Sequence, residues 1–149
     1  MKLQNIEQVL EEQGTAFIQT VGVSMEPMLH ERESTVVLEK PHSRLKRGDV
    51  ALFKRQDGQY VLHRIIRVRE TDYLIRGDNC VGHETVTDAM IVGVMRGYYE
   101  SAEGAFIPRD DAKYQRYVRT VGFRSAMLRG RWYAGRVLRK LKKGICQKR

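Results

Sequence analysis

The chain has 149 residues and a formal net charge of +9, and 42% of its residues are hydrophobic and 30% charged. This length corresponds to one domain with a sizeable core, and no apolar run approaches the roughly 20 residues of a membrane-spanning helix. Two cysteines are too few for a disulfide framework, so we expect a reducing compartment: the cytoplasm, or the cytoplasmic face of a membrane.

Charge is distributed unevenly along the chain. From Ala112 to the C-terminus there is no Asp or Glu, and this segment holds thirteen Lys and Arg residues, so residues 1–111 carry a formal charge of −4. The sequence therefore predicts a mildly acidic domain at 1–111 followed by a strongly basic segment at 112–149.

Short β-strands dominate the predicted structure of the first segment. Residues 3–13 have the apolar spacing of a short amphipathic helix that ends at Gly14. Asp57-Gly58 is a strong hairpin signal between two of the strands. The expected fold class is mainly β, with coiled antiparallel sheets. The predicted strands are 15–21, 34–39, 50–54, 59–69, 71–75 and 90–95, with a last hairpin over 96–108.

The basic segment has a helical pattern instead. Apolar residues recur at intervals of three and four from 114 to 141, with cations between them. Gly122, Gly130 and Gly135 each weaken a helix by up to about 1 kcal/mol relative to alanine, so we expect two helices rather than one.

One stretch has the pattern of a catalytic loop. The predicted strand 15–21 leads into Gly22, Ser24, Met25 and Pro27, and Pro27 prevents the strand ladder from continuing. The serine is thereby expected at the abrupt end of a strand, where a nucleophile is both rigid and reachable. An incidental serine in a strand-ending turn is the simpler alternative.

Three further blocks follow the serine: LKRGDVALF at 45–53, YVLHRIIRV at 60–68 with His63, and LIRGDN at 74–79 with Asp78. In this order and spacing, over roughly residues 15 to 98, the blocks resemble the signal peptidase I / LexA-like superfamily of serine peptidases. The histidine resembles the archaeal and endoplasmic-reticulum branch of signal peptidases, in which His replaces the usual general-base Lys.

The resemblance implies that Ser24 attacks the scissile carbonyl and that His63 takes its proton. Asp78 is the expected third member; an Asp that caps a turn is the alternative for this residue. Glu84 stands where that branch has a further Asp, and Asp88 follows, so both are alternative third members. Gly22 replaces a serine that supplies an oxyanion donor in relatives, so backbone N–H groups must serve instead.

Three functions are compatible with these features. The first is a serine endopeptidase that cleaves a peptide or leader-like segment. The second is a self-cleaving regulator resembling LexA, disfavoured because only about fourteen residues precede the first strand and the base position is His63. The third is a non-enzymatic membrane- or nucleic-acid-binding module built on an inactive peptidase fold.

The expected partners follow from the same features. They are a peptide or protein substrate and, for the basic segment, the anionic surface of a membrane. A solvated basic face whose apolar residues dock on the β core is an equal alternative for this segment. No specific nucleic acid is predicted because no reading motif accompanies the charge. No cofactor or metal is expected, since Cys80 and His83 lack a matching second pair of ligands. The sequence leaves the oligomeric state open.

Overall fold

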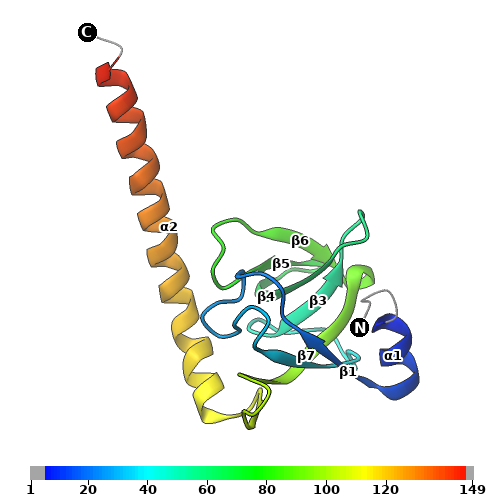
Figure 1. Cartoon of the computed structure of the whole chain (residues 1–149). Coiled ribbons are helices and arrows are strands. Elements are labelled where there is room, and N and C mark those ends of the chain that lie inside the picture. Colours follow the sequence, from blue (N-terminus) through cyan, green and yellow to red (C-terminus); the bar gives the residue numbers. More distant parts are fainter. Residues whose placement is uncertain (1–5, 147–149) are drawn as a thin grey trace.

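A computed structural model describes residues 6–146, and the side chains of residues 6–136. Its architecture is the predicted mainly antiparallel β body with a short helix at the N-terminus, and the C-terminal segment is helical, as predicted, but forms one long helix (Figure 1). The elements are α1 (Ile6–Gln13), β1 (Thr15–Gln19), β2 (Thr35–Glu39), β3 (Val50–Lys54), β4 (Tyr60–Val68), β5 (Asp72–Arg76), β6 (Glu84–Thr87), η2 (Asp88–Met90), β7 (Ile91–Tyr99), β8 (Phe106–Pro108) and α2 (Ala112–Cys146).

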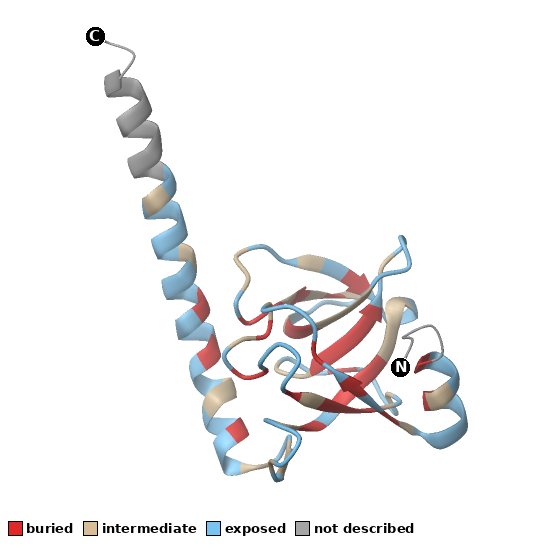
Figure 2. Ribbon diagram, in the orientation of Figure 1, coloured by how far each residue is buried: buried red, intermediate tan, exposed pale blue. Residues whose placement is uncertain are grey.

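The sheet runs in the order β1-β2-β7-β3-β4-β5-β6, and β8 pairs with the far end of β7. Both faces of its central strands are buried (Figure 2). Leu52 faces one core, which also contains Leu38 and Met28, whereas its neighbour Phe53 faces a second core with Tyr73. Successive strand residues point to opposite faces, so this continuously apolar strand lies between two cores.

The β3–β4 hairpin forms where Asp57-Gly58 predicts it. Gly58 adopts a positive φ of 84°, a backbone conformation that glycine tolerates best, and the Arg55 N–H bonds to the Gln59 carbonyl at 2.8 Å. β4 pairs with β3 through residues 60–64 and with β5 only from Arg64 onward. Within the described sheet, the β5-side edge of residues 60–63 is therefore unpaired.

α2 corrects one expectation. The basic segment forms a single helix over Ala112–Cys146, not two. The three glycines do not interrupt it, because their cost of about 1 kcal/mol each is a propensity and not a steric block. No proline intervenes, and good helix formers such as Arg, Lys, Leu, Met and Ala surround the glycines.

Only the first part of α2 packs on the β body. Tyr114, Val121 and Ser125 are buried there, whereas the next turns stand clear of the sheet and are mostly exposed (Figures 1 and 2). The boundary at 111/112 thus marks the start of a helix whose beginning belongs to the core. Over the described part of the chain, no helix is both long and apolar enough to cross a membrane.

Candidate functional site

The loop that carries Ser24 begins earlier than predicted, because β1 ends at Gln19. Buried Met25, Met28 and Leu29 anchor this loop in the core, while Ser24 itself stays half-exposed. Gly22 has a positive φ of 86°, and its N–H donates to Glu31 Oε1 at 3.1 Å. The serine is therefore held by its apolar neighbours and not by a strand.

The turn after β5 clasps this loop. The Asn79 N–H donates to the Ser24 carbonyl at 2.8 Å, and Asn79 Nδ2 donates to the Val23 carbonyl at 3.1 Å. A Cβ placed on Gly77 would lie 2.6 Å from the Ser24 carbonyl oxygen and 3.0 Å from His63 Nε2. Only a glycine fits at this point, and its small size lets the serine loop and the imidazole approach each other.

His63 lies in β4 with its side chain largely buried, at 7% exposure. Its Nε2 faces Gly77 and the serine loop, and its Nδ1 lies 3.5 Å from Glu84 Oε1, outside hydrogen-bonding geometry. Burial lowers the pKa of His63, with Arg55 adding to this effect, while the charges of Glu84 and Asp78 oppose it. The imidazole is thus neutral at pH 7, as a general base must be.

Glu84, at the start of β6, is held by Arg55. The guanidinium donates from Nε and Nη2 to the two carboxylate oxygens, both at 2.7 Å. These bonds lower the pKa of Glu84 despite its partial burial, so it is an anion beside His63. Sequence reasoning assigned no role to Arg55, because its position beside a hairpin turn gives no sign of the strand that faces it.

Asp78 has different partners. Arg64 Nε and Nη2 donate to its two oxygens at 2.8 and 2.7 Å, and the Tyr117 hydroxyl donates to Oδ2 at 3.0 Å. Arg64 and Asp78 are only 2% and 5% exposed. Burial alone would lower the pKa of Arg64, but the bonds and charge of Asp78 outweigh it and raise that pKa.

Arg64 follows His63 in β4, so the two side chains leave opposite faces of the strand. The ion pair with Asp78 and the histidine are therefore adjacent but separate. One signal in the sequence indicates that Arg64 has an acidic partner. Arg64 shares a strand face with apolar Leu62 and Ile66, and burial of an unpaired charge on such a face would cost free energy.

The remaining predicted residues lie around the site or away from it. Asp88, in η2, accepts hydrogen bonds from the Tyr73 hydroxyl and from Arg44 Nη1, the latter at 2.9 Å. Asp88 therefore fixes the hydroxyl of Tyr73, a residue of the second core. Pro27 follows a cis peptide bond in the serine loop and is exposed. Met25 and Gly22 border a pocket beside Ser24.

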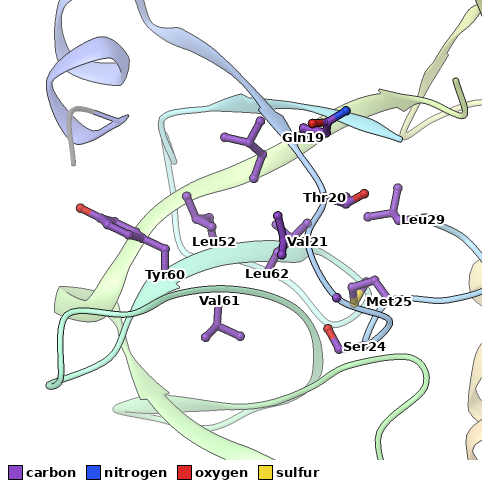
Figure 3. Close-up of a pocket in the computed structure, with 12 residues that line it drawn as sticks. Gln19, Thr20, Val21, Ser24, Met25, Leu29, Leu52, Tyr60, Val61 and Leu62 are labelled. Carbon is purple, nitrogen blue, oxygen red and sulfur yellow. The ribbon is translucent and has the colours of Figure 1, made fainter. Parts of the chain in front are cut away.

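This pocket has a volume of about 240 Å³ and lies between the end of β1 and the start of β4. Figure 3 shows Ser24 at one end of it, with Tyr60 and Val61 across from the Thr20–Val21 backbone. Its walls are mainly apolar and include Ile18, Leu29, Leu52 and Leu62. The pocket is therefore suited to an uncharged side chain placed next to the serine.

No family model, curated protein or solved structure matches this chain significantly.

Proposed function

We propose that the protein is a serine endopeptidase in which Ser24 is the nucleophile, His63 the general base and Glu84 the carboxylate that supports the base. The main support is the meeting of the serine loop and His63 Nε2 at Gly77, with Glu84 on the Nδ1 side of the same ring. A nucleophile, a base and an orienting group arranged in this order are what a serine hydroxyl needs to become reactive.

In the proposed reaction, the Ser24 hydroxyl attacks the carbonyl carbon of a peptide bond, and its proton passes to His63 Nε2. Ionised Glu84 stabilises the imidazolium that forms. The imidazolium then donates the proton to the leaving amine as the C–N bond breaks. Water, deprotonated by His63, then attacks the acyl carbon. The ester bond to Ser24 Oγ breaks as His63 returns the proton to that oxygen, and the product leaves with a new C-terminal carboxylate.

Two contacts must tighten for this reaction. Over the described residues, no hydrogen bond joins Ser24 Oγ to His63, and Glu84 Oε1, 3.5 Å from Nδ1, is outside hydrogen-bonding geometry. Catalytic hydrogen bonds are often loose before substrate binds and tighten in the complex. Substrate that covers the pocket would also exclude water and strengthen the pairing of Glu84 with the ring.

Two exposed backbone edges support an extended peptide as the substrate. β1 is an edge strand, and residues 60–63 of β4 lack a partner on the β5 side within the described sheet. The pocket lies between the end of β1 and this part of β4. A peptide strand inserted there gains main-chain hydrogen bonds from the edges, and its side chain next to the cleaved bond enters the apolar pocket.

The test is cleavage of a synthetic peptide library, read by mass spectrometry in water enriched in oxygen-18. We expect new C-termini that carry the heavy oxygen. Ser24→Ala and His63→Gln should abolish them, and Ser43→Ala, at an exposed serine distant from the site in the sequence, should not. Circular dichroism checks that the variants fold. Cleavage that persists in Ser24→Ala, or no cleavage by the native chain, would contradict the proposal and favour a binding module.

A further inference from the structure

We propose that the exposed part of α2 is a binding surface for an anionic lipid bilayer, on which the helix lies in the plane of the interface. This proposal is independent of the peptidase chemistry. It concerns an outer stripe that consists of Phe123, Ala126, Met127 and Ala134, together with the cations beside it.

The outer stripe faces away from the β body. Buried Val121 and Ser125 mark the docked side of α2, and Phe123 lies midway between them in the sequence. Residues two positions apart on a helix are rotated by roughly 200°, so Phe123 points to the opposite side. It is 71% exposed, and Met127, one turn further on, is 54% exposed.

The stripe follows helical spacing, with Gly130 and Arg131 in the turn between Met127 and Ala134. Ala126 and Met127 follow Phe123 by three and four residues, and Ala134 follows Met127 by seven. The sequence continues with apolar residues three, four and seven positions after Ala134, at 137, 138 and 141. Two large apolar side chains that are this exposed and one turn apart, on a helix docked by its other face, form a patch of the kind that marks an interaction surface. An apolar stripe on a helix too polar to span a bilayer is typical of interfacial helices.

Charge decides which partner fits. Arg119 lies one turn before Phe123 and Arg131 one turn after Met127, and both are exposed. The segment from 112 to 149 contains thirteen cations and no acid, so two copies of this helix would repel each other. A surface of anionic headgroups attracts these cations and accepts the apolar side chains beneath them.

One aromatic side chain at the flank of the stripe adds to this match. Tyr133 is 57% exposed and lies roughly 80° around the helix from Phe123, whereas Trp132 lies on the opposite side of the helix. Such an amphipathic ring prefers the boundary between headgroups and acyl chains. A nucleic acid would use the cations, but it gives no reason for the exposed Phe123 and Met127.

The experiment is co-sedimentation of the full chain with vesicles of phosphatidylcholine alone, or of an equal mixture with phosphatidylglycerol. We expect binding to the mixed vesicles only, and weakening as salt is raised. Phe123→Ser combined with Met127→Ser should reduce binding about tenfold or more, because two apolar side chains no longer enter the bilayer. Phe17→Ser, at a residue of β1 that is 54% exposed, is the matched control and should bind normally.

Several results would overturn the proposal. Equal vesicle binding by the double variant and the native chain would show that the outer stripe does not contribute to binding. Equal binding to neutral and mixed vesicles would show that the cations do not contribute. Light scattering that shows a dimer, dissociated by the double substitution, would identify a second copy as the partner. Binding of single-stranded RNA that survives the substitution, without vesicle binding, would assign the cations to nucleic acid.

Discussion

Two carboxylates near His63 have different cationic partners, and we propose that they have separate tasks. Asp78 is enclosed by Arg64 and Tyr117 on one face of β4, whereas Glu84 is held by Arg55 on the side of His63 Nδ1. Each carboxylate is held by an arginine through both of its oxygens, so position decides between them. In the proposed mechanism Glu84, 3.5 Å from Nδ1, supports the base, whereas Asp78 positions the turn that contacts Ser24.

This difference predicts a change in pH dependence for Glu84→Gln. Burial lowers the pKa of His63 below its ordinary value of about 6.5, and the charge of Glu84 opposes that effect. Without this charge the pKa of His63 falls further, so the acid limb of kcat/KM moves to lower pH while the maximal rate drops. NMR titration of the His63 ring protons should show the same direction without substrate.

Asp88→Asn is the control for that experiment, because Asp88 contacts Tyr73 and Arg44 and should leave the titration of His63 in place. A His63 pKa that is unchanged in Glu84→Gln, or raised by it, would exclude Glu84 as the supporting carboxylate.

At the scale of elements, the Arg64–Asp78 pair joins three parts of the fold. Arg64 belongs to β4, Asp78 to the turn after β5, and Tyr114 and Tyr117 to α2. Arg64 Nη1 donates to the Tyr114 hydroxyl at 3.0 Å and to the Gly48 carbonyl at 2.8 Å, so every part of the guanidinium is engaged. The same turn contacts the serine loop through Asn79. The docked part of α2 thus supports the site indirectly.

Asp78→Asn should therefore destabilise the protein strongly. It leaves the Arg64 charge buried without its counter-ion, a change that costs about 3–5 kcal/mol. Urea unfolding followed by circular dichroism measures the loss. Glu100→Gln is the matched control: it removes an exposed partner of Lys113 and should cost about 1 kcal/mol or less. Similar losses for both variants would mean that the buried pair has no special structural role.

The strands could be predicted from the sequence because they are local patterns, and the serine and histidine of the proposed site also lie in local motifs. The Asp57-Gly58 turn and the apolar runs are encoded by neighbouring residues, and Ser24 and His63 lie in recognisable motifs. β6 was not predicted, since its four residues lack apolar alternation and pair only at a sheet edge. Which carboxylate lies beside His63 depends on which arginine reaches it, and this is set by pairing between strands distant in the sequence.

The continuity of α2 was misjudged for a different reason. The three glycines lower the helix propensity of the segment and so predict a break. No proline interrupts the segment, however, and its first turns pack on the core, which outweighs the cost of the glycines. Buried Tyr114 and Val121 order the beginning of the helix, and propagation from an ordered end is far easier than nucleation. Removal of the whole helix after Asp111 would also remove these residues from the core, so substitutions on its outer stripe are the better probe of membrane binding.

At the scale of the whole molecule, α2 joins the two proposed activities. Its first turns pack on the body that holds Ser24 (Figure 1). Its outer stripe lies on the side of the helix opposite buried Val121 and Ser125. A bilayer bound by the outer stripe would hold the cleft at a fixed distance from the surface. Substrates attached to the same surface would then meet the enzyme at a raised effective concentration.

This arrangement predicts that the two activities combine in cleavage of a membrane-attached substrate. The substrate is the best peptide from the library, anchored by an acyl chain in mixed phosphatidylcholine–phosphatidylglycerol vesicles. The native chain should cleave it at least roughly tenfold faster than Phe123→Ser/Met127→Ser does. The reason is that enzyme and substrate bound to the same surface meet at a raised effective concentration. The same peptide without its anchor should be cleaved equally by both proteins, because neither residue lines the pocket beside Ser24. Liquid chromatography of the cleaved peptide measures both rates. Equal rates on the anchored peptide would show that the outer stripe does not bring the site to its substrate, and a loss on the free peptide would mean that the substitutions disturb the site itself.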